Sequence, residues 1–82
     1  MDYLKYAGSG VMRSTYTASD PGFFDTHGLM AKIRISDGTV YIVNGGTADG
    51  YYPLKSGDVM DFVGCIRYYG NATIEYLLFD KA

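Results

Sequence analysis

The stretch KIRISDGTVYIV, residues 32–43, carries the clearest structural signal in the chain. Apolar and polar residues alternate on both sides of Asp37-Gly38, which is typical of strands with one buried face. An Asp-Gly pair can supply the two positive-φ residues of a type I′ turn. The sequence therefore predicts a hairpin with a two-residue turn at Asp37-Gly38, in which Ile35 faces Val40.

This predicted hairpin separates its side chains by polarity. A slip of one residue would move every side chain to the opposite surface, so the pattern specifies the register. The buried face would hold Ile33, Ile35, Val40 and Ile42, and the other face would hold Lys32, Arg34, Tyr41 and Val43.

A second hairpin is predicted at Gly70-Asn71. A three-residue loop, Gly70 to Ala72, sorts the flanking side chains better than a two-residue loop. It sets Tyr68 opposite Ile74 on the inner side, and Arg67 opposite Glu75 on the outer side. Asn71 tolerates the positive φ that such loops require.

Turn signals recur along the rest of the chain, and the segments between them are rich in Tyr, Val, Ile and Thr. Further strands are expected over 11–17 and 59–63, with a terminal strand over 3–6. This spacing is typical of all-β domains. We predict one β domain over residues 1–82, a small antiparallel sandwich or barrel of about six to seven short strands.

Composition narrows the function classes. The 82 residues contain 7 Lys and Arg against 9 Asp and Glu, a formal net charge of −2, which does not favour nucleic-acid binding. No apolar run approaches the roughly 20 residues of a membrane span. The N-terminus has no basic patch followed by an apolar stretch, so no secretory signal is expected.

The residues that could support catalysis are sparse. The single histidine, His27, lies near Asp25 and is expected in a loop or turn, and the single cysteine, Cys65, has apolar neighbours and is expected to be buried and inert. One Cys and one His do not make a zinc site. The segment GGTADG, residues 45–50, leaves calcium open as an alternative, but turn chemistry explains it. We predict no enzyme activity, no cofactor and no metal site.

Aromatic residues mark a candidate interface instead. Tyrosine gives a large contact area with a polar tip and suits protein interfaces. The two long irregular stretches, residues 18–28 and 44–58, are where a binding surface is expected. The predicted interface residues are Phe23, Phe24, Tyr41, Tyr51, Tyr52 and Leu54.

From residue 39 to residue 79 the order of features resembles the small all-β structural proteins that tailed bacteriophages encode near their capsid genes. A strand leads into a glycine-rich loop, then a "YPLKSGD" step, a short strand and a closing hairpin. The loop DPGFFDTHG, residues 20–28, is longer and more aromatic than that pattern. The residues that carry the resemblance are Tyr52, Pro53, Leu54, Gly57, Val59, Ile66, Tyr68, Ile74, Tyr76 and Leu77.

The resemblance implies a non-enzymatic virion component of the head-decoration or head-fibre-associated type. It would be assembled in the host cytoplasm, and it would bind the major capsid protein or another virion protein, commonly as a homo-oligomer. The residues themselves leave an alternative open, a small binding module directed at carbohydrate or a host protein through a tyrosine-rich surface.

Overall fold

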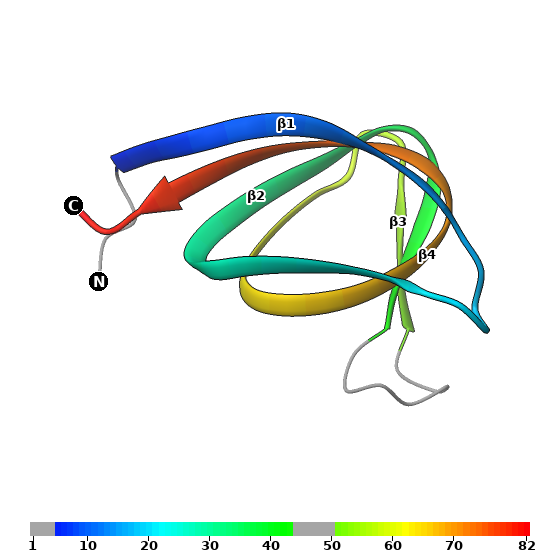
Figure 1. The fold of residues 1–82 in the computed structure, drawn as a ribbon. Helices are drawn as coiled ribbons and strands as arrows, with labels where there is room; N and C mark the ends of the chain where they lie inside the picture. Colours follow the sequence, from blue (N-terminus) through cyan, green and yellow to red (C-terminus); the bar gives the residue numbers. More distant parts are fainter. Residues whose placement is uncertain (1–4, 44–50) are drawn as a thin grey trace.

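The computed structural model describes residues 5–43 and 51–82, with only the backbone of Tyr51 described (Figure 1). This part of the chain is built of strands and turns. The strands are β1 (Lys5–Tyr16), β2 (Gly22–Val43), β3 (Tyr51–Lys55) and β4 (Val59–Asp80). The predicted all-β class is confirmed.

The strands form one antiparallel sheet in the order β1-β4-β2-β3. Residues 30–34 of β2 pair with β4 on both sides, with residues 59–63 on one side and 75–79 on the other. The middle of β2 thus lies between two parts of the same strand, β4. The sheet therefore curls around on itself as a barrel does (Figure 1). Instead of the expected six to seven short strands, the described residues form four strands, of which β2 and β4 each run for 22 residues.

The predicted hairpin at Asp37-Gly38 is wrong. The strand β2 passes straight through these residues, and Ile35 pairs with Ile74 rather than with Val40. The register shifts by one residue between Ile35 and Asp37, which is a β-bulge. A bulge and a two-residue turn both move the apolar positions from odd to even numbers, so the sequence pattern could not distinguish them.

Glycine is required at this bulge. Gly38 has a φ of 82°, and a Cβ built on it would lie 2.1 Å from the carbonyl oxygen of Asn71. The residue thus permits a close approach of β2 to β4 rather than a turn.

The predicted hairpin at Gly70-Asn71 is also wrong. The strand β4 continues through both residues, where Gly70 pairs with Tyr16 and Ala72 pairs with Ser14 on β1. Gly70 has a φ of 114°, and an added Cβ would lie 2.5 Å from the carbonyl oxygen of Thr39. Glycine again allows a close approach within a continuous strand.

A corner at Thr26 to Gly28 redirects β2. His27 has a φ of 53° and Gly28 a φ of 86°. The His27 amide donates to Oδ1 of Asp25 at 2.8 Å, and the buried Thr26 Oγ1 accepts from the Gly64 amide at 2.9 Å. His27 therefore lies at a bend inside a strand, in the stretch 18–28 that the sequence predicted to be irregular.

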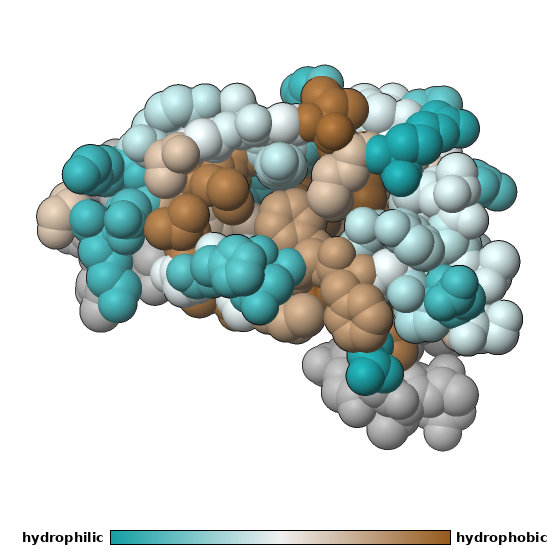
Figure 2. Space-filling view, viewed as in Figure 1, coloured by the Kyte–Doolittle hydropathy of each residue, from teal (hydrophilic) through white to brown (hydrophobic). Residues whose placement is uncertain are grey.

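The core lies on the inner surface of the curled sheet. The buried hydrophobic cluster consists of Ile33, Ile35, Val40, Ile42, Leu54, Tyr68, Ala72 and Ile74. The predicted inner positions of both supposed hairpins are thus confirmed although their pairing is not. Partly buried side chains pack against this cluster, and Figure 2 shows hydrophobic residues reaching the surface in the region framed by β2 and β4.

The remaining expectations fit the observed strands in part. The strand expected over 11–17 belongs to β1, and the one expected over 59–63 opens β4. Of the expected terminal strand, residues 3 and 4 lie outside the described residues. The same holds for residues 44–50 of the second long stretch, which are the whole glycine-rich loop, so the calcium alternative considered for residues 45–50 lies outside the described residues. The remainder of this stretch forms β3 and a turn in which the Gly57 amide donates to the carbonyl oxygen of Ile35 at 2.7 Å.

Candidate interaction surface

A band of aromatic and apolar side chains lies on the outer surface of β2, β3 and β4, where these strands run side by side. Ile42 lies between Tyr41 and Val43 in the sequence, and Tyr68 lies between Arg67 and Tyr69; both are buried in the core. Because successive strand residues point to opposite faces, the band lies on the surface opposite the core. Two rows of cross-strand partners form it, Phe23, Arg67 and Val43 in one row and Tyr69, Tyr41 and Pro53 in the other. We call these residues the aromatic face.

Arg67 is the cation at the centre of the first row. Its guanidinium carbon lies 5.2 Å from the centre of the Phe23 ring. At an exposed site such a contact contributes ~0.5–1 kcal/mol. The Phe23 side chain nevertheless remains 60% exposed, so most of its apolar surface is available to a partner.

The second row contains a stacked pair of tyrosines. The ring centres of Tyr41 and Tyr69 lie 5.0 Å apart, with an angle of 23° between the ring planes. Both residues are half-buried, and such a pair contributes ~0.5–1.5 kcal/mol beyond the area it buries. The stack holds both rings in place on the sheet, which lowers the entropy that binding would cost.

The predicted interface residues do not come together as one site. Phe23 and Tyr41 lie on the aromatic face. Tyr52 is 62% exposed, but strand alternation places it on the same side of β3 as Leu54. Only the backbone of Tyr51 is described.

Two predicted interface residues lie in the interior. Leu54 is a core residue, 3% exposed. Phe24 makes edge-to-face contacts with Phe62 at 5.7 Å and Tyr76 at 5.1 Å between ring centres. Neither Leu54 nor Phe24 forms part of the exposed aromatic surface.

Four further members of this face were not predicted as interface residues: Val43, Pro53, Arg67 and Tyr69. The alternation in KIRISDGTVYIV had already placed Val43 beside Tyr41 on the outer side, and Arg67 had been assigned to the outer side of its strand. The sequence did not reveal which strands pair. Arg67 lies between Phe23 and Val43 because β4 runs between two distant parts of β2.

A second feature is a groove of about 540 Å³ on the outer surface of β1, β2 and β4. We call it the outer groove; its lining includes Val11, Val59 and Leu77 together with Lys32, Arg34 and Glu75. Lys32 Nζ lies 3.3 Å from Asp61 Oδ1, and Arg34 Nε donates to Glu75 Oε1 at 2.9 Å. These exposed pairs contribute ~0–1 kcal/mol each.

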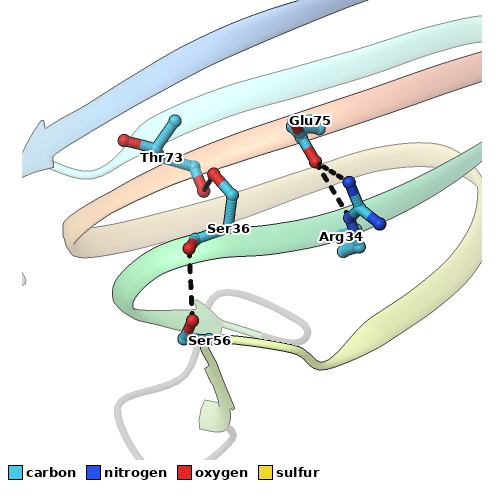
Figure 3. A network of polar contacts seen from close by, with 5 residues as sticks. All are labelled: Arg34, Ser36, Ser56, Thr73 and Glu75. Carbon is cyan, nitrogen blue, oxygen red and sulfur yellow. Dashed lines mark hydrogen bonds and ion pairs between the residues drawn. The ribbon is translucent and has the colours of Figure 1, made fainter.

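Hydroxyl groups continue this polar network along the neighbouring turn (Figure 3). Ser36 Oγ donates to the carbonyl oxygen of Thr73 at 3.3 Å. Ser56 Oγ donates to the carbonyl oxygen of Ser36 at 3.2 Å. The bulged segment of β2 is thus tied to β4 on one side and to the turn after β3 on the other.

The side chains considered for catalysis are exposed and lie close together near the corner of β2. His27 Nδ1 lies 3.9 Å from Asp25 Oδ2, and the side chains are 84% and 53% exposed. Cys65 is exposed rather than buried, which corrects the sequence-based prediction, and it is adjacent across the strands to Asp25. Among residues 5–43 and 52–82 there is no group of three or more His, Cys, Asp or Glu arranged to hold a metal ion.

The described residues include no helix that is long and apolar enough to cross a membrane. Comparison of the whole chain with protein-family models, with curated proteins and with solved structures finds no significant match in any of the three.

Proposed function

We propose that this chain is a non-enzymatic docking module that binds a protein partner through its aromatic face. The observation that carries the proposal is the pair of cross-strand rows in which exposed Phe23 and Arg67 lie beside the stacked Tyr41 and Tyr69. Aromatic residues and arginine are enriched at the energetically dominant positions of protein interfaces.

The charge distribution supports a protein rather than a nucleic acid as the partner. Arg67 is the one cation among the residues of the aromatic face, and Asp25 lies in the next row toward the corner of β2. A nucleic-acid surface usually neutralises several phosphates with several cations. The formal net charge of −2 supports the same choice.

The arrangement of the rings also favours protein over carbohydrate. A sugar ring stacks on an open aromatic face, and here Arg67 lies over one face of Phe23, while Tyr41 and Tyr69 each have one face in contact with the other ring, so fewer faces are open to a sugar. Protein side chains can use ring edges and hydroxyl groups as well as ring faces.

The resemblance to phage head proteins supplies a setting for this proposal. In that setting the module is a structural component of a tailed-phage virion, and its partner is the major capsid protein or another virion protein. A small domain gains stability from docking, since its own core contributes only a few kcal/mol of net stability.

Site-specific photo-crosslinking tests the proposal in the cells that produce the chain. A benzophenone amino acid replaces Phe23 on β2. As a matched control it replaces Val63, another exposed apolar residue, 51% exposed, which lies on β4 outside the aromatic face. We expect a discrete protein adduct at position 23 and a much weaker one at position 63. An adduct with nucleic acid, or equal labelling at both positions, would contradict the proposal.

The identity of the adduct tests the setting separately. A capsid or other virion protein, identified by mass spectrometry, supports the virion role. A cellular protein supports the docking module but excludes the virion setting as the site of this contact.

A further inference from the structure

The three arginines of the chain differ in what their guanidinium groups contact. Arg13 donates from Nη1 to the hydroxyl of its cross-strand partner Thr73 at 2.8 Å, and Arg34 forms an ion pair across the strands. Arg67 contacts the Phe23 ring, but within the described part of the chain its guanidinium has no hydrogen-bond or ion-pair partner. The N–H donors of Arg67 are therefore available to a partner.

The acidic side chain in the next row is engaged elsewhere. Asp25 pairs with Cys65, two residues before Arg67, so it lies on the same outer surface. Its Oδ1 accepts a hydrogen bond from the His27 amide at 2.8 Å, and its Oδ2 lies 3.9 Å from Nδ1 of His27. These contacts hold the corner of β2, and Asp25 forms no ion pair with Arg67. The positive charge of Arg67 is thus left without an acidic neighbour on this surface.

A partner that covers the aromatic face also covers Arg67. The cross-strand neighbours Phe23 and Val43 lie on either side of Arg67, and Tyr69 follows it on the same face. A charge that becomes buried without an opposite charge is strongly destabilising. Among apolar and aromatic side chains an opposite charge is also attracted more strongly than it is in water. Tight docking on this face therefore requires an anionic group opposite Arg67.

We propose that the partner places the carboxylate of an Asp or Glu side chain on Arg67, with apolar residues on either side against Phe23 and Val43. This inference rests on the docking proposal and specifies the chemistry of its partner. A guanidinium and a carboxylate match as two parallel hydrogen bonds, which gives direction as well as attraction. The Phe23 ring already restricts the Arg67 side chain, so less rotamer entropy is lost when the pair forms.

A single arginine favours a side-chain carboxylate over the other anionic groups of proteins. Surfaces that recognise phosphorylated residues normally contain clusters of arginines, whereas Arg67 is the one cation among the residues of the aromatic face. A C-terminal carboxylate is typically bound by backbone N–H groups. Around Arg67 the backbones of β2 and β4 are paired with each other instead.

Photo-crosslinking from Val43 measures what Arg67 contributes, because a benzophenone amino acid at that position leaves both Phe23 and Arg67 in place. We expect Arg67→Gln to lower the yield of the protein adduct at least about tenfold, since truncating one partner of a buried charge pair speeds dissociation. Arg67→Lys keeps the charge but loses the paired donors, so it should retain more of the yield.

Arg13→Gln is the matched control. It makes the same chemical change at another exposed arginine, which lies on β1 outside the aromatic face. The yield from Val43 should stay unchanged in this variant. Urea denaturation of Arg67→Gln and Arg13→Gln should give similar free energies of unfolding, which separates a loss of docking from a loss of folding.

A carbodiimide identifies the group opposite Arg67. This reagent joins an amine to a carboxylate as an amide, with loss of water, where the two are in contact. In a lysate of the producing cells, we expect Arg67→Lys to be joined through position 67 to an Asp or Glu side chain of the partner, located by mass spectrometry. Arg13→Lys, treated in the same way, should give no link to that partner through position 13.

The outcomes separate this inference from the docking proposal. If neither position 23 nor position 43 gives a protein adduct, both proposals fail. An adduct at position 43 that Arg67→Gln leaves undiminished, or that Arg13→Gln diminishes equally, overturns the carboxylate inference alone. A link from position 67 to the C-terminus of the partner, or a phosphorylated residue at the mapped contact, also overturns it and leaves the docking module standing.

Discussion

The two halves of the curled sheet pack differently. Around the bulge at Gly38 the inner side chains are completely buried, with Ile35 and Val40 at 0% exposure. Toward the corner at Thr26 to Gly28 several large inner side chains, such as Phe24 and Met60, are only half-buried, although the smaller Thr26 and Ala31 are buried. Gly38 and Gly70 let backbones approach each other closely in the first of these regions.

This contrast shows where the free energy of folding is concentrated. A side chain that is removed from a closed region leaves a cavity, whereas one that is removed from an open region is partly replaced by water. The closed half should therefore respond to truncation more strongly than the open half, although both contribute to the same hydrophobic cluster.

The largest expected effect comes from Ile33→Ala, compared with Met60→Ala. The two residues are cross-strand partners, but Ile33 is 1% exposed and Met60 is half-buried. We expect Ile33→Ala to lower the free energy of unfolding by ~4 kcal/mol and Met60→Ala by ~1–2 kcal/mol. Urea denaturation measures both, and equal losses would show that the cost of truncation does not depend on how far the side chain is buried.

The next effect isolates the close approach at the bulge. Gly38 and Gly28 have nearly the same φ, 82° and 86°, but only Gly38 has atoms within 4 Å of an added Cβ. Gly38→Ala should therefore cost ~3 kcal/mol, from backbone strain and a clash, and Gly28→Ala should cost ~1 kcal/mol, from strain alone. The same denaturation experiment measures the difference, which would vanish if β2 and β4 could separate freely at this point.

A smaller effect is expected from Thr26→Val at the corner of β2. The Thr26 hydroxyl is the acceptor for the Gly64 amide, and valine keeps the shape while removing that acceptor. We expect a loss of ~1–2 kcal/mol, because a partly buried amide is left without a partner. Hydrogen exchange at the Gly64 amide should accelerate more than exchange at residues around Gly38. Uniform acceleration would instead indicate that the corner and the bulge unfold together.

The smallest effect concerns alkaline pH. Burial raises the pKa of Tyr68, and the neighbouring Tyr16 raises it further. The neutral phenol is thus favoured in the folded state, so stability is unchanged below the ordinary tyrosine pKa of about 10 and falls as pH rises above it. Thermal unfolding from pH 8 upward should show this loss, and Tyr68→Phe should reduce it. Tyr6→Phe is the control, since Tyr6 is 58% exposed.

The sequence predicted which side chains face the core far better than it predicted which strands pair. Alternation assigned Ile33, Ile42 and Ile74 to the interior correctly, because that pattern depends only on local geometry. Gly38 and Gly70, which were interpreted as turn residues, instead lie inside long strands with positive φ. Glycine is suited to both, and only the contacts of the folded chain distinguish them.

The aromatic face shows the same limit. Phe23 and Tyr41 were identified by residue type, which is a local property. Leu54 was assigned to the surface because its segment looked irregular, whereas it is part of a strand paired with β2. Arg67 was not recognised, since its two neighbours in the face, Phe23 and Val43, come from opposite ends of one strand.

The double pairing of β2 with β4 also affects how the chain reaches its native state. Cross-strand partners such as Gly22 and Tyr68, or Lys5 and Asp80, are far apart in the sequence, and the predicted local hairpins that could have formed early do not exist. Domains dominated by such distant contacts fold on a scale of about milliseconds to seconds. The residues Leu77, Leu78 and Phe79 of β4 pair with both β1 and β2, so ordering of the sheet requires the chain as far as Phe79 to have left the ribosome.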